Sequence, residues 1–277
     1  MKERVTGGLI AGYVILVVLA AVYMYPFVIA IIDSFKTDAE ATGDPMGLIP
    51  QTFTFAAYER LFFGTDLPRW AANSVFITLV VTTFRVFFDS LAGYALSRLR
   101  FRGRGAIFAL FIAVLAVPSV VLMIPRFLVI KELGLYDTYG GMILPLLADA
   151  AGIFIMKQFF DSIPVSIEEA ARIDGAGVFR TFWSVTLPMA TPALITLTIL
   201  SFQGSWNEFA HFVISRQSPE LHTLTTGVGS LVSGQLGSGN QFPLKLAAAV
   251  LMTIPVAIVF FIFQRRIMST TEGGEKG

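Results

Sequence analysis

The stretch from Pro164 to Pro188 reads PVSIEEAARIDGAGVFRTFWSVTLP and forms a polar island between two long apolar runs. Ser166 followed three residues later by Glu169 is a capping-box pattern, which predicts that a helix starts at Ser166. Gly175 is expected to end that helix, and a second short helix is predicted over 178–183. Neither helix can bury much apolar surface by itself. We therefore interpret the stretch as a helix-turn-helix docking element.

The composition places the chain among membrane proteins. Of its 277 residues, 55% are hydrophobic and 14% are charged, and the mean hydropathy is positive. These values lie outside the range of ordinary soluble domains. A net charge of +1 gives no reason to expect a nucleic-acid partner. The absence of cysteine excludes disulfides and thiolate metal sites but leaves the redox compartment open.

The hydropathy pattern predicts an all-α, polytopic protein with a single transmembrane domain over 1–277. Crossing a bilayer takes about 20 apolar residues, and six segments meet that length. The expected spans are 8–32, 70–97, 105–125, 139–159, 187–206 and 246–264. Pro118 is expected to kink the third span without ending it. The first span exceeds the roughly 7–15 apolar residues of a signal peptide, so we expect it to be retained.

The distribution of basic residues gives these spans an orientation. Twelve of the 20 Lys and Arg residues fall on the side of the docking element, seven fall on the other side, and Arg85 lies within a span. The densest cluster occupies 98–104, and basic loops mark the cytoplasmic side. A nucleic-acid patch is the alternative interpretation of this cluster, but the loop is very short for that. We expect both termini and the docking element, 164–186, to be cytoplasmic.

The docking element resembles the EAA loop of ATP-binding-cassette importer permeases. Glu169, Ala170 and Ala171 are followed by Gly175 and then, after nine residues, by VTLP, where Val185 replaces the usual Ile. The longer form EEAARIDGAG resembles the carbohydrate-uptake branch, specifically the smaller, maltose-type permease subunit. The resemblance continues in order through NS at 73–74, YALSRLRF at 94–101, GLYDTYGGMILP at 134–145, WNEF at 206–209 and FQRRI at 263–267.

This resemblance implies an importer permease in the bacterial cytoplasmic membrane, with a carbohydrate such as a disaccharide or oligosaccharide as substrate. The implied partners are a second permease subunit, two cytosolic ATPase subunits and an extracytoplasmic solute-binding protein. ATP and Mg²⁺ would be bound by the ATPases, because this chain lacks a G-x-x-x-x-G-K-[ST] loop. We therefore expect no enzymatic activity and no cofactor on this chain.

The resemblance also assigns roles within the docking element. Glu169 would contact the ATPase, and Ala170 and Ala171 would allow close approach. Asp174 and Gly175 complete the coupling set, with Gly175 making the turn. The alternative is that Glu169 only caps the helix and Gly175 only ends it.

Charged residues inside the spans are a second group of candidates. Arg85 and Asp89 lie four residues apart on one face of the second span, and Asp149 lies near the middle of the fourth. Intramembrane charges are rare and face protein or water. They indicate either a polar substrate path or an internal ion pair that fixes helix packing or a subunit contact, and the residues alone favour the ion pair.

The outer end of the fifth span carries a third group. Gln203, Trp206, Asn207 and Glu208 combine an aromatic ring with hydrogen-bonding groups, a combination that suits a sugar site. Alternatively, Trp206 is an interfacial anchor and the others form a helix end in water. The Gly/Ser-rich stretch 227–240 resembles the external loop that reaches toward the binding protein, or is a flexible connection.

Other function classes are less well supported. His211 and His222 stand alone in a predicted external loop, where we expect them to be solvated, and no pattern for metal binding or acid–base catalysis surrounds them. An ion-coupled secondary transporter is the main alternative, but it would lead one to expect inverted repeats and a carboxylate relay. A membrane-embedded enzyme is a third alternative, but the sequence shows no set of residues with a catalytic pattern. The end of the chain, STTEGGEKG, departs from the resemblance by adding Glu272 and Glu275.

Overall fold

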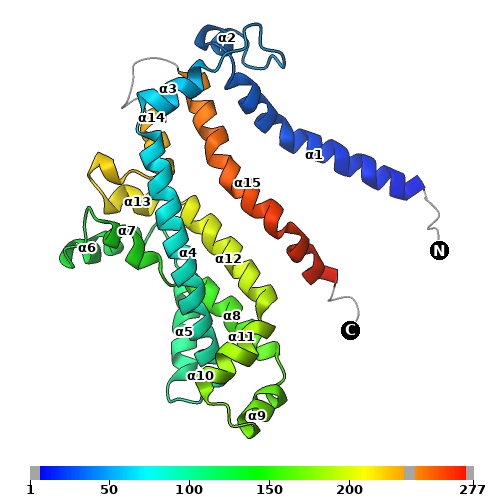
Figure 1. Ribbon diagram of the computed structural model, residues 1–277, viewed down its shortest axis with the longest axis vertical. Helices are drawn as coiled ribbons and strands as arrows, with labels where there is room; N and C mark the ends of the chain where they lie inside the picture. Colours follow the sequence, from blue (N-terminus) through cyan, green and yellow to red (C-terminus); the bar gives the residue numbers. More distant parts are fainter. Residues whose placement is uncertain (1–6, 234–240, 273–277) are drawn as a thin grey trace. The chain divides into compact units, whose positions relative to one another are not determined.

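The computed structural model describes residues 7–233 and 241–272, with side chains described as far as residue 264. All regular secondary structure in these residues is helical (Figure 1), so the predicted all-α class is confirmed for this part of the chain. The chain divides into two compact units, one formed by 7–67 with 228–254 and the other by 68–227 with 255–272. We describe each unit by itself.

The smaller unit begins with the long helix α1. Its elements are α1 (Gly7–Asp33), α2 (Asp38–Gly43), α3 (Ala56–Gly64), the end of α14 and the first part of α15. The apolar window of α1 has no buried residues, and an apolar surface of this size needs lipid or another protein to cover it. After α1 the chain turns around Lys36, whose ammonium group lies 2.6 Å from Asp33 and donates to the carbonyl oxygens of Asp44 and Gly47. The buried charge is thereby paired.

The larger unit contains the docking element and most of the packed core. Its first half consists of α4 (Leu67–Arg98, whose first residue belongs to the smaller unit), α5 (Arg104–Leu115), α6 (Met123–Glu132), α7 (Tyr139–Ile143), η1 (Leu144–Leu146) and α8 (Ala150–Ser162). Its second half consists of α9 (Val165–Ile173), α10 (Val178–Thr181), η2 (Phe182–Thr186), α11 (Leu187–Met189), α12 (Thr191–Trp206), α13 (Ala210–Ser215), η3 (Pro219–Leu221), the start of α14 (Leu224–Val232) and the end of α15 (Phe242–Glu272).

Among the described residues, four helical segments are long and apolar enough to cross a membrane, and a bent pair is a candidate fifth. The four are Gly8–Asp33, Leu67–Arg98, Tyr139–Ser162 and Phe242–Gln264, and the pair is Val178–Met189 with Thr191–Trp206. The expectation of one continuous third helix over 105–125 is wrong. Helix α5 ends at Leu115 and turns lead to α6, because Pro118 has no N–H to donate and disfavours helical geometry in the residue before it.

Two further spans are interrupted rather than straight. Within Tyr139–Ser162 the helix breaks before Ala150, and Asp149 has extended backbone angles at the N-cap of α8. The predicted fifth span, 187–206, is not one straight helix. Helix α12 begins at Thr191, after a bend of 81° that separates it from the helical run over 178–189. The larger unit therefore contains two sharp breaks, one before α8 and one before α12.

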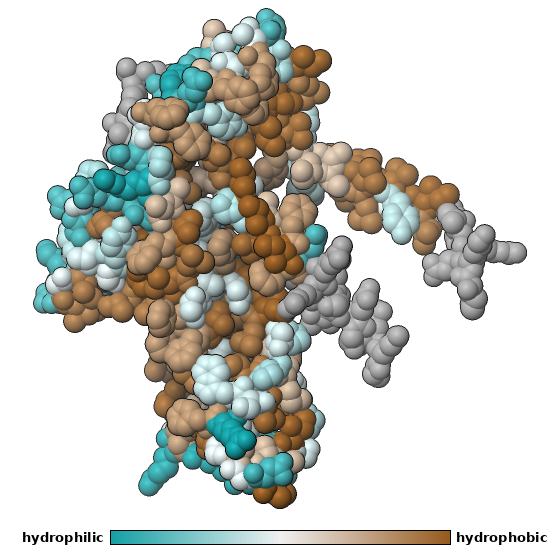
Figure 2. Space-filling view, viewed as in Figure 1, coloured by the Kyte–Doolittle hydropathy of each residue, from teal (hydrophilic) through white to brown (hydrophobic). Residues whose placement is uncertain are grey.

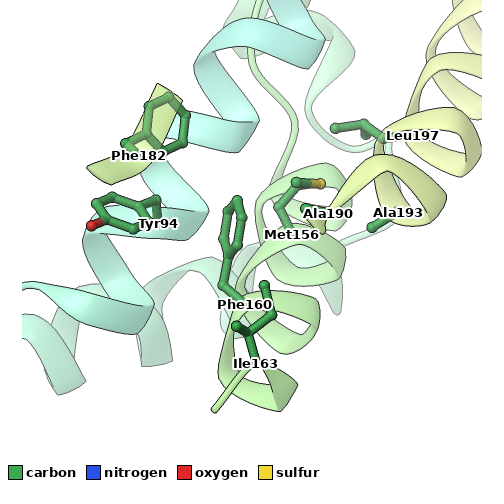
Figure 3. Close-up of a cluster of buried hydrophobic side chains, with 8 residues drawn as sticks. All are labelled: Tyr94, Met156, Phe160, Ile163, Phe182, Ala190, Ala193 and Leu197. Carbon is green, nitrogen blue, oxygen red and sulfur yellow. The ribbon is translucent and has the colours of Figure 1, made fainter. Parts of the chain in front are cut away.

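A hydrophobic cluster holds α4, α8, η2 and α12 together. Figure 3 shows it as Tyr94, Met156, Phe160, Ile163, Phe182, Ala190, Ala193 and Leu197. The helices α4 and α8 approach closely because glycines stand at their crossing. A Cβ atom on Gly93 would lie 2.7 Å from the Cβ of Met156, and one on Gly152 would lie 2.0 Å from the Oδ2 of Asp89. Small residues at such crossings are typical of membrane helices.

The surface of the larger unit is largely hydrophobic along its helices. Figure 2 shows hydrophilic residues around α6, α7 and α13 and, mixed with hydrophobic ones, at the end that carries α9 and α10. Exposed apolar residues include Leu79 on α4 and Leu110 on α5. Such an exposed apolar surface needs lipid or another protein to cover it.

Candidate functional site

The docking element forms two short helices joined by a tight turn, as predicted, but its start differs from the prediction. Helix α9 begins at Val165, with Pro164 at the N-cap and no side-chain cap hydrogen bond. The capping box of Ser166 and Glu169 is therefore wrong, since Ser166 already lies inside the helix. Pro164 suits the N-cap position because its ring fixes φ near the observed −57°.

The turn after α9 depends on Gly175. This residue has a φ of +81°, a left-handed conformation that only glycine adopts at little cost. Its N–H donates to the Arg172 carbonyl, and the N–H of Ala176 donates to the Ala171 carbonyl at 2.9 Å. These two bonds form a Schellman motif. The turn is therefore the one the sequence predicts at this position.

One face of the docking element is exposed and carries apolar side chains. Ile173 is 87% exposed and Phe179 is 76% exposed, although both are large hydrophobic residues. Among the predicted coupling residues, Glu169, Ala170 and Asp174 are exposed and Ala171 is half-buried. We call Ile173 and Phe179, together with Glu169, the coupling face. Two large apolar side chains exposed so close together are a feature of surfaces that a partner covers.

The opposite side of α9 is held by Glu168, a residue that the sequence analysis did not single out. Its carboxylate is buried, with Oε1 lying 3.0 Å from Nε of Arg98 as an ion pair. Tyr94 donates to Oε2 and Thr186 donates to Oε1. The guanidinium of Arg98 also donates to the carbonyl oxygens of Phe160 and Ile163. We call the Arg98–Glu168 pair the latch.

The latch connects four helical elements. Arg98 and Tyr94 lie on the last turns of α4, the two carbonyls lie at the end of α8, and Glu168 lies on α9. Thr186 belongs to η2, a π-helical turn whose Phe182 packs against Tyr94 in the core (Figure 3). π-helical turns are rare and occur often at functional sites. Buried contacts therefore connect α9 to α4, α8 and η2.

A second polar group lies where α4, α8 and α12 meet. Nε of Arg85 donates to the Leu146 carbonyl at 2.7 Å, and its guanidinium lies near Gly204 of α12. Oδ1 of Asp89 accepts a hydrogen bond from the Asp149 N–H at 3.0 Å. Within the described part of the chain, Arg85 and Asp89 do not form the expected ion pair. Both side chains instead bind backbone groups that the break before α8 leaves free.

Asp149 itself acts as a helix cap. Its carboxylate accepts hydrogen bonds from the N–H groups of Ala151 and Gly152, so it caps α8 and does not lie within a helix. A carboxylate in that position stabilises a helix N-terminus. Arg85, Asp89 and Asp149 therefore hydrogen-bond to the backbone around the break before α8, which gives each of them a structural role.

The residues at the end of α12 are divided between the interior and the surface. Trp206 is 3% exposed and its ring stacks on Phe202, so it does not offer a free ring to a ligand in this conformation. The Glu208 carboxylate accepts from the His211 N–H at 2.9 Å. Gln203 is half-buried and Asn207 is exposed. The four candidates thus do not form one open surface.

The segment after α12 is tied to the start of α4. Asn73 donates to the carbonyls of Glu220 and His222, each at 2.8 Å, and accepts from the Tyr139 hydroxyl. The NS motif at 73–74 is the signal that points to this clamp, because Ser74 also accepts from the Leu224 N–H.

Asp137 fixes a neighbouring turn in the same region. Its carboxylate accepts hydrogen bonds from the Ser218 hydroxyl and from the N–H groups of Gln217 and Ser218. These bonds, the one from the Ser218 hydroxyl foremost, hold the pKa of Asp137 below its ordinary value. Asp137 also has a positive φ of 60°, a conformation that Asp tolerates better than most residues.

The expectation that both histidines are solvated is wrong for His211. This side chain is 2% exposed, and its Nε2 lies 3.1 Å from the Met142 carbonyl oxygen. Burial lowers the pKa of His211 below its ordinary value, which favours the neutral ring at pH 7. His222 is half-buried beside the Trp70 ring. The described residues contain no cluster of three or more His, Cys, Asp or Glu side chains able to hold a metal ion.

A comparison with protein families gives this geometry its context. The family described as "binding-protein-dependent transport system inner membrane component" matches residues 89–270, a range that contains the latch and the whole docking element. The chain belongs to this family. The permease fold and the resemblance inferred from the EAA-like stretch are thereby confirmed.

Relatives extend over nearly the full chain. The arabinooligosaccharides transport system permease protein AraQ of Bacillus subtilis is 33% identical, covering 94% of this chain and 92% of the relative. The sulfoquinovosyl glycerol transport system permease protein SmoH of Agrobacterium fabrum is 34% identical, covering 92% of this chain and 89% of the relative. A crystal structure of a bacterial ABC transporter involved in alginate import contains a chain with 28% identity and a TM-score of 0.80, covering 92% of this chain and 95% of that one.

Proposed function

We propose that this chain is a permease subunit that moves a carbohydrate across the bacterial inner membrane and takes its energy from ATPase subunits bound at the coupling face. Two ATPases, a second permease and an extracytoplasmic solute-binding protein complete the importer. The proposal includes six spans, both termini in the cytoplasm and the docking element on the cytoplasmic side. The excess of basic residues on that side supports the orientation.

One observation carries the coupling role. Ile173 and Phe179 are exposed on the same short element whose base is fixed by the buried latch. An exposed apolar tip on a rigid base is suited to receive a force from a partner and pass it to α4 and α8. Capping and helix termination explain Gly175 but do not explain two large apolar side chains in water. Glu169, Ala170, Ala171 and Asp174 are proposed as further contacts of the docking element.

The carbohydrate class rests on the relatives. AraQ and SmoH are named for arabinooligosaccharides and sulfoquinovosyl glycerol, and their similarity extends over most of this chain. For the substrate path we propose Gln203 and Asn207 as contacts, because they are accessible at the end of α12. Glu208 is half-buried like Gln203 and is a further proposed contact, whereas the buried Trp206 would take part only after a conformational change. We assign Arg85, Asp89 and Asp149 to helix packing.

Copurification tests this proposal. The wild-type chain, expressed with its cognate ATPase, is expected to retain that ATPase in stoichiometric amount, and the double variant Ile173→Ser/Phe179→Ser is expected to lose it. Phe63→Ser is the matched control, because Phe63 is 90% exposed on α3, outside the docking element. Uptake driven by an ion gradient in the isolated chain would instead support a secondary transporter.

A further inference from the structure

A cleft beside the docking element is lined by arginines that the coupling role does not use. It has a volume of about 480 Å³ and lies between the α4–α5 loop and α9. We call it the arginine cleft. Its charged lining consists of Arg98, Arg100, Arg104, Glu168, Glu169 and Arg172.

The charges of the arginine cleft do not cancel. Arg98 and Glu168 neutralise each other in the latch. This leaves Arg100, Arg104 and Arg172 with Glu169 as the other carboxylate of the lining. Asp161 lies behind Ser97 of the lining and is paired with Lys157. In 7–233 and 241–264, no carboxylate oxygen lies within salt-bridge distance of these three arginines. Arg104 donates only to the Leu99 carbonyl at 3.3 Å. The cleft is therefore cationic and has room for an anion.

The helix that leaves the cleft is apolar and exposed. Helix α5 starts at Arg104, and Ile107, Leu110 and Val114 follow along one side of it. These side chains are 42%, 64% and 43% exposed. The other side of α5 packs on α8, where the rings of Phe108 and Phe154 stack. Arg104 of the cleft lining is therefore also the first residue of a helix that exposes an apolar strip along its length.

We propose that the arginine cleft binds the phosphate group of an anionic membrane phospholipid, whose acyl chains lie along the exposed side of α5. Arginine groups recognise phosphate through several N–H donors, and basic pockets beside membrane helices are suited to anionic head groups. A soluble phosphate compound shares the anionic chemistry but has no use for the apolar strip. The lipid proposal rests on the proposed orientation of the chain in one respect, which is that the lipid belongs to the cytoplasmic leaflet.

A lipid bound in the arginine cleft would affect coupling, because the cleft includes the latch residues. Its lining includes both latch residues and Arg172, which lies on the last turn of α9. A phosphate bound there would link α9 to the α4–α5 loop by bridging Arg172 with Arg100 and Arg104. The lipid would then reinforce the base of the coupling face without touching Ile173 or Phe179.

Native mass spectrometry of the full chain in detergent tests the proposal, because it requires no ATPase and is independent of the copurification result. Phosphatidylglycerol is expected to remain bound in preference to phosphatidylcholine, and excess inorganic phosphate is expected not to displace it. Arg100→Gln/Arg104→Gln should weaken phosphatidylglycerol retention about 30-fold, the equivalent of about 1 kcal/mol for each arginine. Arg102→Gln, in the same loop but outside the cleft lining, should bind as the wild type does.

Four results would overturn the proposal. Equal retention of both lipids, or equal loss in Arg102→Gln, would indicate nonspecific surface charge. Displacement by inorganic phosphate without lipid preference would assign the cleft to a soluble anion. Unchanged lipid retention in Arg100→Gln/Arg104→Gln would show that these arginines do not hold the lipid. An unfolding midpoint of the double variant equal to that of Arg102→Gln establishes that both variants are folded.

Discussion

The Nε atom of Arg98 lies 3.0 Å from the Glu168 carboxylate, and the two side chains are only 7% and 2% exposed. This contact joins the end of α4 to the first helix of the docking element. A buried charge is costly unless it is paired, so the two residues depend on each other. The latch therefore fixes the position of α9, and with it the coupling face, relative to α4.

Removing the arginine of the latch is expected to destabilise the protein strongly. Arg98→Met leaves Glu168 buried without its cation, which costs about 3–5 kcal/mol. The double variant Arg98→Met/Glu168→Met should recover part of that loss, because no unpaired charge remains. The free energy of unfolding of the purified chain measures both effects.

Arg60 provides the control for this experiment. Its pair with Asp38 is 45% and 42% exposed, and exposed pairs contribute about 0–1 kcal/mol. Arg60→Met should therefore unfold nearly as the wild type does. A loss in Arg98→Met no larger than that in Arg60→Met would mean that the latch is not a stabilising contact.

Replacement of Gly175 separates coupling from folding. A bulky residue such as valine must adopt the φ of +81°, which costs roughly 1–2 kcal/mol, or change the turn. We expect Gly175→Val to abolish uptake while membrane insertion persists. Gly64→Val is the control, because an added Cβ there would meet open space and Gly64 lies at the end of α3, outside the docking element. Normal uptake by Gly175→Val would remove the coupling role of this turn.

The crossing of α4 and α8 predicts a contrast between two glycines. An alanine Cβ at Gly152 would lie 2.0 Å from Oδ2 of Asp89 and 2.8 Å from Cδ1 of Leu197. We expect Gly152→Ala to lower the free energy of unfolding by about 1–3 kcal/mol. Gly204→Ala should have little effect, because its Cβ would lie 3.5 Å from Arg85, an ordinary contact. Equal stability of the two variants would contradict the close packing at Gly152.

Asp137 predicts a pH dependence in the turn around Ser218. Its pKa is lowered in the folded protein, so its contribution is complete above the unfolded pKa of about 3.9 and is lost as the pH falls through the folded pKa. Asp137→Asn keeps a residue that tolerates positive φ but removes the charge. Hydrogen exchange of residues 216–218 should be slower in the wild type than in this variant at pH 7. A difference that stayed constant well below pH 4 would exclude the carboxylate as its source.

Much of the architecture followed from sequence patterns with a local cause. The apolar runs predicted α1, α4 and α15, and Gly175 predicted a turn that needs a left-handed residue. The composition and the EAA-like stretch pointed to the membrane permease class that the family comparison confirmed. These features depend on neighbours in the chain, and a sequence displays such neighbours directly.

The missed features depend on contacts between distant residues. Glu168 is paired with Arg98, 70 positions away, and nothing near Glu168 in the sequence distinguishes it from Glu169. Likewise, Arg85 and Asp89 have the spacing of an ion pair, but the break before α8 offers each a backbone partner instead. The third span ends early because turns after Leu115 replace the expected kinked helix. Such choices are determined by packing in three dimensions.

The most direct test of the account is the labelling of single cysteines, since the natural chain contains none. Ile173→Cys is expected to react with a membrane-impermeant maleimide in inside-out vesicles stripped of ATPase, and to be protected when the ATPase is restored. Phe63→Cys should react only from the opposite side, with or without the ATPase. Labelling of Ile173→Cys from the outer side, or equal labelling with the ATPase bound, would contradict the claim that this chain receives its driving force at the coupling face.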